Sequence, residues 1–165
     1  MTTPAALTGR QQQKADRRAA LLRSARSLMA RNGYLGVRLE DIGRAAGVSG
    51  PAVYRHFASK DAVLAELLID VSDRLLASAR QVQERCTSPT EVVRGLVGVH
   101  VEFALTEPEL ILIDDRDRSH LPPAALDRMR YTQRRYVDIW VDALGWAVPS
   151  GDPVLDRTRV HAVLG

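Results

Sequence analysis

A chain of 165 residues with 45% hydrophobic and 26% charged residues can bury a core and has the balance of a globular protein. Its single cysteine, Cys86, excludes an internal disulfide and favours a reduced, cytoplasmic location. No apolar run approaches the roughly 18 residues that a membrane-spanning helix needs, and the N-terminal segment lacks an apolar signal core, so no membrane partner is expected.

Charge is distributed unevenly along the chain. Residues 1–60 contain 11 Lys and Arg against 3 Asp and Glu, whereas residues 61–165 contain 12 against 17, and the net charge of the whole is +3. A basic front part predicts a polyanionic partner, although charge alone also allows a merely solvated basic face. We therefore expect two domains, residues 1–60 and residues 61–165, of which only the first meets nucleic acid.

Apolar residues recur with helical periodicity throughout, which predicts an all-α fold. The first dozen residues are polar and are expected to fray. Their basic side chains and those just behind them would form an arm: Arg10, Lys14, Arg17 and Arg18. The first helix is predicted from about Asp16 to Arg31, and Asn32-Gly33 should end it in a left-handed turn.

Two short helices and a turn follow within about twenty residues. The second helix is predicted over about Leu39–Ala45, and Gly47 can adopt a positive φ at its end. Ser49 is the expected N-cap of the third helix, in which Val53 and Phe57 face the core at a spacing of four. This is the helix-turn-helix plan, whose second helix enters the major groove of DNA.

The rest of the chain is predicted to be five more helices. Ser59 should cap the fourth, and Ser88 with Glu91 forms a capping box for the fifth. Their expected extents are 60–84, 89–105, 108–114, 124–146 and from 154 onward. Because the last amphipathic pattern is still running at the final residue, we expect a truncated protein with incomplete C-terminal helices.

The run GYLGVRLEDIGRAAGVSGPAVYRHFASKDAVL, residues 33–64, resembles the N-terminal signature of TetR-type transcriptional regulators. The matching residues, in the family's order and spacing, are Gly33-Tyr34, Asp41-Ile42, Ala46-Gly47-Val48-Ser49, Tyr54, His56-Phe57 and Lys60. The resemblance implies a three-helix DNA-binding domain followed by a helical ligand-binding and dimerisation domain. It further implies a ligand-responsive repressor that binds a palindromic operator on double-stranded DNA as a homodimer.

The resemblance assigns DNA contacts to named side chains. Tyr54, His56 and Lys60 would meet phosphates, which set register and strength rather than sequence. Small apolar surfaces suited to thymine methyl groups lead the third helix: Gly50, Pro51 and Ala52. Arg55 would read guanine or, equally, contact a phosphate, and Arg44 would contact the flanking backbone or merely solvate its helix.

Two positions depart from the family pattern. Val37-Arg38 stands where the family places Thr or Ser, so the side-chain cap of the second helix is lost, and Arg38 would contact a phosphate instead. Glu40 stands where some members carry a base-reading Arg, although its carboxylate could accept from cytosine N4.

The second domain should enclose an effector site. The candidate lining residues are His100, Phe103, Met129, Tyr136 and Trp140, each of which plain core packing would also explain. The segment from PELILID to HLPPAALDRMRYTQRRYVDIWV is similar to regulators associated with lipid and acyl-CoA metabolism. The expected effector is therefore an acyl-CoA or a lipid-like molecule.

Catalysis is disfavoured, and no cofactor or metal is expected. Asp114, Asp115 and Asp117 are interleaved with Arg116 and Arg118, which predicts a solvated, self-neutralised turn. No phosphate loop, nucleophile elbow or paired Cys/His motif is present. The main alternative function is a helical small-molecule-binding protein without operator-specific DNA binding.

Overall fold

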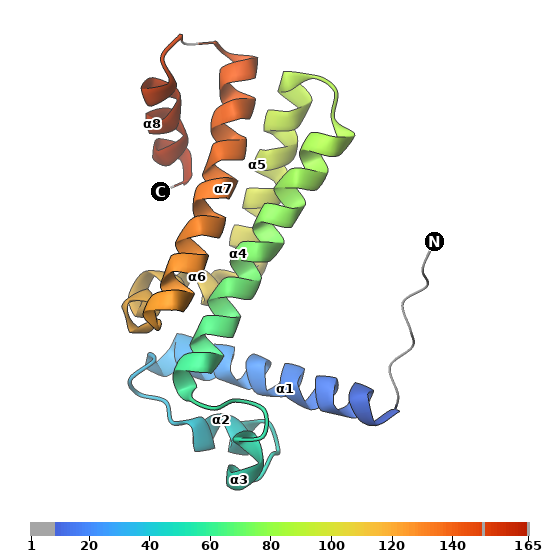
Figure 1. Cartoon of the computed structure of the whole chain (residues 1–165), viewed down its shortest axis with the longest axis vertical. Coiled ribbons are helices and arrows are strands. Elements are labelled where there is room, and N and C mark those ends of the chain that lie inside the picture. The colour runs from blue at the N-terminus through green and yellow to red at the C-terminus, as the bar shows by residue number, and fades with distance from the viewer. Residues whose placement is uncertain (1–8, 150, 165) are drawn as a thin grey trace. The chain divides into compact units, whose positions relative to one another are not determined.

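The computed structural model describes residues 9–149 and 151–164, and the regular elements among them are all helical, as predicted (Figure 1). The elements are α1 (Gly9–Asn32), α2 (Leu39–Ala45), α3 (Gly50–Val53), α4 (Lys60–Arg85), α5 (Pro89–Thr106), α6 (Pro108–Asp117), the 3₁₀ turn η1 (Arg118–His120), α7 (Pro123–Ala147) and α8 (Pro153–Leu164). Among these described helices, none combines the length and the apolarity that crossing a membrane would require.

The chain divides into two compact units. The head unit consists of Met1–Leu67 with Leu112–Leu121, and the rear unit consists of Leu68–Ile111 with Pro122–Gly165. Both α4 and α6 therefore contribute residues to each unit. The expected boundary between a DNA-binding domain, residues 1–60, and an effector-binding domain, residues 61–165, stays a prediction.

The head unit is built around the apolar stripes that the periodicity predicted. Leu21, Ala25 and Met29 of α1 are fully buried, and α1 packs on α2, which packs on α3. Val53 and Phe57 are buried as expected, with 0% and 2% of their surfaces exposed. A four-residue helix cannot hold itself together, so this packing keeps α3 in place.

The N-terminal boundary of α1 differs from the prediction. Described residues before Asp16 are helical from Gly9 on, because glutamine and lysine are good helix formers and Gln12 bonds to Asp16 at 2.9 Å. Residues 1–8 of the expected frayed segment lie outside the described residues. Arg10, Lys14 and Arg17 are thus exposed positions on a helix rather than on a frayed arm.

Arg18 was wrongly assigned to the basic arm. Its Nε donates to Glu66 Oε1 at 2.9 Å, and its guanidinium lies 4.0 Å from the centroid of the Phe57 ring. A further N–H donates to the carbonyl of His56. Arg18 therefore fixes α1 both to the segment between α3 and α4 and to α4 itself.

The turn and cap predictions are largely confirmed. Gly33 and Gly47 have φ values of 75° and 69°, and the Ser59 hydroxyl accepts from the Ala62 N–H at 3.1 Å. Both bonds of the Ser88–Glu91 capping box are present at 3.3 Å. Ser49 is the N-cap of α3 as predicted, although its hydroxyl makes no cap bond.

Ser49 caps α3 with its backbone instead. Its carbonyl accepts from the N–H groups of Ala52 and Val53 at 2.9 and 3.2 Å, and its hydroxyl makes no cap bond. The helix is also shorter than predicted, because after Val53 the chain continues to Phe57 in tight turns. One of these turns closes through the bond from the His56 N–H to the Val53 carbonyl at 2.9 Å.

The rear unit has its own core, to which α4, α5, α7 and α8 all contribute. Its buried members are Leu76, Ala79, Val92, Leu96, Tyr136, Ile139, Trp140, Ala143 and Val160. The unit therefore buries the apolar faces of four amphipathic helices against one another, in keeping with the predicted periodicity.

Two glycines of α5 give a matched test of this packing. A Cβ added at Gly95 would lie 2.6 Å from Val82 Cγ1, whereas one added at Gly98 would meet nothing within 4 Å. We expect Gly95→Ala to lower the free energy of unfolding by about 1–3 kcal/mol through overpacking. Gly98→Ala should raise it by up to about 1 kcal/mol, because alanine is the better helix former. Urea unfolding followed by circular dichroism measures both, and two equal shifts would contradict the close approach of α4 and α5.

Candidate functional site

A hollow of about 440 Å³ opens in the head unit beside the start of α2, the end of α3 and the start of α4. It is lined by Leu35, Val37, Arg38, Leu39, Glu40, Tyr54, Ala58, Ser59 and Lys60. Three side chains predicted to contact DNA, Arg38, Tyr54 and Lys60, thus share one concave surface. We refer to it as the α2–α4 hollow.

Tyr54 is 52% exposed at the rim of the α2–α4 hollow, as a DNA contact must be. Its hydroxyl donates to Glu40 Oε1 at 2.5 Å. This hydrogen bond raises the pKa of Tyr54 and lowers the pKa of Glu40, so the pair is a neutral phenol on a carboxylate. The hydroxyl predicted to meet a phosphate is therefore already bonded to an acidic side chain.

Lys60 holds the loop that precedes α2. Its Nζ donates to the carbonyls of Tyr34 and Val37 at 2.6 and 2.8 Å and lies 4.0 Å from the centroid of the Tyr34 ring. Burial raises the pKa of Tyr34 to about 12, together with a hydrogen bond from the Tyr34 hydroxyl to Asp61. An ammonium has three N–H donors. Two are used on the loop, and the predicted phosphate contact would use the third.

The start of α2 is capped by a side chain inside the helix, whereas the family pattern uses the side chain of the N-cap residue. Arg38 occupies the N-cap with extended backbone angles, φ −102° and ψ 155°, and its side chain makes no cap bond. The Asp41 carboxylate instead accepts from the Arg38 N–H at 3.1 Å. An acidic residue three positions after the cap was the signal for this arrangement. The guanidinium of Arg38 is left exposed beside the hollow.

The remaining predicted DNA contacts lie along α2, along α3 and in the turn that follows α3. Pro51 and Arg55 are exposed, and a Cβ on Gly50 would meet nothing within 4 Å, so the start of α3 is open to a base edge. Ala52 is half-buried. Arg44 is exposed on α2 and lies 3.3 Å from Asp41 in an ion pair with it.

His56 is half-buried, unlike Tyr54 and Arg55, which are exposed. Burial lowers its pKa, and the positive charges of Arg18, Lys14, Arg17 and Arg55 lower it further. Its Nδ1 is buried and has no hydrogen-bond partner within the part of the chain that the structure describes. A neutral imidazole offers one N–H donor, so any phosphate contact by His56 would be a hydrogen bond rather than an ion pair.

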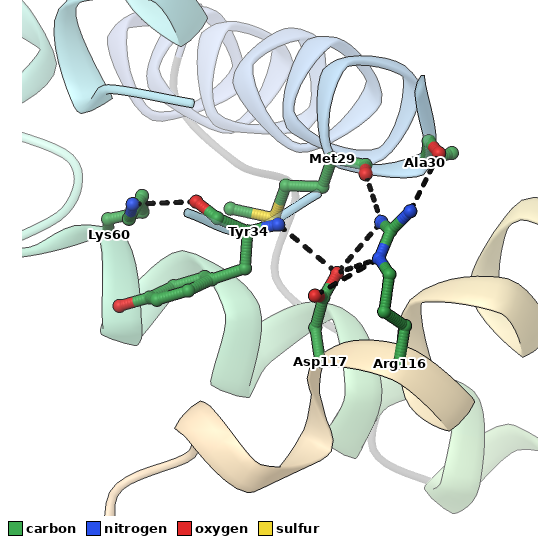
Figure 2. A network of polar contacts seen from close by, with 6 residues as sticks. All are labelled: Met29, Ala30, Tyr34, Lys60, Arg116 and Asp117. Atoms are coloured by element: carbon green, nitrogen blue, oxygen red, sulfur yellow. Dashed lines mark hydrogen bonds and ion pairs between the residues drawn. The ribbon is translucent and has the colours of Figure 1, made fainter. Parts of the chain in front are cut away.

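A second polar cluster in the head unit was missed by the sequence analysis (Figure 2). Asp117 is 4% exposed and accepts from the Tyr34 N–H at 3.2 Å and from Arg116 Nη2 at 2.9 Å. Arg116 also donates to the carbonyls of Met29 and Ala30 at the end of α1. The solvated turn expected here is wrong, because these residues end α6 and Asp117 is buried.

The rear unit brings three of the five predicted effector-binding residues into one aromatic cluster. The His100 Nδ1 and the Tyr136 hydroxyl are 3.3 Å apart, and the His100 and Trp140 ring centroids are 6.1 Å apart. Burial lowers the pKa of His100 and raises the pKa of Tyr136, so both side chains are neutral at neutral pH. The indole Nε1 of Trp140 is buried and has no acceptor among the described residues.

Phe103 connects this cluster to a hollow of about 180 Å³ between α4 and α5. Its ring centroid lies 6.3 Å from that of His100, and it lines the hollow with Val71, Arg74, Leu75, Ser78, Val99, Glu102, Thr106 and Glu107. Met129, the fifth predicted residue, is 1% exposed and does not line this hollow. The role of Met129 in effector binding stays a prediction.

The helix-turn-helix head and the helical rear unit define the class of protein. A family model described as bacterial regulatory proteins, tetR family, matches residues 21–67. The chain belongs to the TetR family and is a DNA-binding transcriptional regulator. It is similar to the HTH-type transcriptional repressor KstR2 of Mycolicibacterium smegmatis, with 31% identity over 154 residues that cover 90% of this chain and 74% of that protein.

Solved structures agree on the fold. The ketosteroid transcriptional regulator KstR2 of Mycobacterium tuberculosis matches with a TM-score of 0.78 and 24% identity over 90% of this chain and 79% of that one. A TetR-family transcriptional regulator from Bordetella parapertussis matches with a TM-score of 0.81 and 26% identity, covering 88% of this chain and 77% of that one.

Proposed function

We propose that the protein is a ligand-responsive repressor that binds a palindromic operator as a homodimer in the cytoplasm. One observation carries the DNA-binding part: Pro51, Tyr54 and Arg55 are exposed around α3 while Val53 and Phe57 fix the same segment to the core. A short helix with one face fixed to the core and the opposite face exposed to solvent is suited to the major groove. We propose no catalytic activity, in line with relatives named as regulators.

The proposed contacts divide by what they read. Arg55 reads guanine O6 and N7, and the small surfaces of Gly50, Pro51 and Ala52 approach thymine methyl groups. The other predicted residues position the protein on phosphates: Arg38, Arg44, Tyr54, His56 and Lys60. Residues 1–60 supply all of these contacts, which is the sense in which they form a DNA-binding domain.

The proposed effector site is the aromatic cluster of the rear unit with the adjoining hollow at Phe103. The neutral rings of the cluster favour an effector with an apolar part, such as an acyl-CoA or a lipid-like molecule, and the charged and hydroxyl side chains of the adjoining hollow could meet a polar part. The unpartnered indole N–H of Trp140 supports a hydrogen-bond acceptor on that effector.

The proposed regulation is a shift between two populations of the dimer. Two heads that read successive major grooves must lie about 34–36 Å apart along the duplex. An effector that binds better to a dimer with another spacing lowers the population that fits the operator. An operator complex should therefore dissociate when an acyl-CoA that raises the melting temperature of the protein is added.

Binding-site selection from random duplex DNA, followed by anisotropy titrations at several salt concentrations, tests the DNA-binding proposal. We expect a palindromic consensus and an affinity that falls linearly with salt on logarithmic axes. Failure to enrich any sequence, with effectors still shifting the melting temperature, would favour the small-molecule-binding protein without operator-specific DNA binding.

A further inference from the structure

Glu40 introduces a negative charge into a surface otherwise suited to phosphates. The α2–α4 hollow that it lines also contains the cations Arg38 and Lys60, and Glu40 is the one acid among its described lining residues. Its exposed carboxylate lies beside groups that DNA would have to approach. A carboxylate repels a phosphate, so Glu40 should oppose DNA that binds through its backbone alone.

The Glu40 carboxylate also binds the Tyr54 hydroxyl, which is the group proposed to contact a phosphate. The Tyr54 hydroxyl donates to Glu40 Oε1 at 2.5 Å, across fourteen positions of sequence, from the turn after α3 to the first turn of α2. A phenol has one O–H, so the hydroxyl cannot donate to Glu40 and to a phosphate at the same time. The pair must separate before Tyr54 can bind the backbone.

A base edge can supply the replacement partner that Glu40 then lacks. In the major groove, cytosine N4 is a hydrogen-bond donor and the side chains that accept from it are Glu and Asp. Glu40 lies in the first turn of α2, next to the exposed guanidinium of Arg38, at the same rim as Tyr54. If the cytosine amine replaced the Tyr54 hydroxyl as the donor, the Glu40 carboxylate would keep a hydrogen bond. The Tyr54 hydroxyl would then be free to donate elsewhere.

We propose that Glu40 is a specificity-determining residue that couples base reading to phosphate binding. On random DNA, Glu40 stays hydrogen-bonded to the Tyr54 hydroxyl, and the negative charge of Glu40 weakens binding to the DNA backbone. On an operator with a cytosine at the facing position it accepts from N4 and releases Tyr54 to a phosphate. This inference depends on the proposed operator binding. It adds that Glu40 lowers the affinity for DNA sequences that lack the facing cytosine.

The test compares Glu40→Ala, which leaves no acceptor at position 40, with the unaltered protein on the selected operator and on random duplex DNA at one salt concentration. We expect the affinity for random DNA to rise, and the ratio of operator to random affinity to fall about tenfold, the size of one lost base contact. Site selection repeated with Glu40→Ala should lose a preference for one C·G pair in each half-site.

Two further variants separate this mechanism from a simple change of net charge. Asp115→Ala removes one negative charge from an exposed position of α6 in the head unit, at a residue that does not line the hollow. It should leave the affinity ratio unchanged. The double variant Glu40→Ala with Tyr54→Phe should lose much of the gain on random DNA, because the released hydroxyl is absent.

Three outcomes would overturn the coupling. They are an unchanged consensus in Glu40→Ala, an affinity ratio equal to that of Asp115→Ala, or a double variant that keeps the whole gain. If the unaltered protein selects no operator at all, the proposed function fails with it. A clear operator with an unchanged ratio removes this inference alone. Circular dichroism should show native helix content in each variant, since Glu40 and Asp115 are exposed.

Discussion

Asp117→Ala should lower the free energy of unfolding by about 2–3 kcal/mol, because it leaves a buried N–H and a partly buried guanidinium without their acceptor. The Tyr34 N–H and Arg116 Nη2 both lose a partner that lies within 3.2 Å. Asp117→Asn should cost less, since its amide oxygen can still accept from the Tyr34 N–H. Urea unfolding followed by circular dichroism gives the values.

Arg118→Ala is the matched control for Asp117→Ala. Arg118 pairs with Asp114 at 2.5 Å in the same segment, but its side chain is 47% exposed. Removing an exposed ion pair should change stability by less than about 1 kcal/mol. If Asp117→Ala destabilised the protein no more than Arg118→Ala, the cluster in Figure 2 would not stabilise the head unit.

Arg55→Ala should weaken binding to the selected operator by roughly 10- to 100-fold, because a bidentate contact to guanine contributes about 1–3 kcal/mol of discrimination. Binding to random DNA should weaken far less. Arg44→Ala, at an equally exposed position on α2, should weaken both kinds of DNA to a similar small degree. Anisotropy titrations at fixed salt measure all four affinities.

Equal weakening on operator and random DNA by Arg55→Ala would assign Arg55 to a phosphate. That outcome would leave base reading to the start of α3 and to Glu40. The control matters because Arg55 and Arg44 carry the same charge, so a difference between them reports position rather than electrostatics.

Features with a short sequence spacing could be predicted well. The left-handed turns at Gly33 and Gly47, the caps at Ser59 and Ser88, and the burial of Phe57 all follow from residues at most four positions apart. Backbone sterics, capping and helical periodicity act over that range, so the sequence displays them directly.

Contacts between distant residues could not be predicted in the same way. Arg18 and Glu66 are 48 positions apart, and Tyr34 and Asp117 are 83 apart. Nothing local distinguishes Asp117, which is buried, from Asp115, which is exposed two positions earlier. The same holds for the candidate site. The exposed residues of α3 followed from periodicity, whereas the bond between Tyr54 and Glu40 depends on how α2 and α3 pack.

The discontinuity of the head unit has a consequence for how the protein is made. All residues proposed to touch DNA lie before position 61, but the carboxylate that accepts from the Tyr34 N–H belongs to Asp117. During synthesis, domains generally fold as units from the N-terminus onward. Here the ribosome releases the helix-turn-helix before the end of α6 exists. The nascent head must wait for roughly another fifty residues before its last stabilising contacts can form.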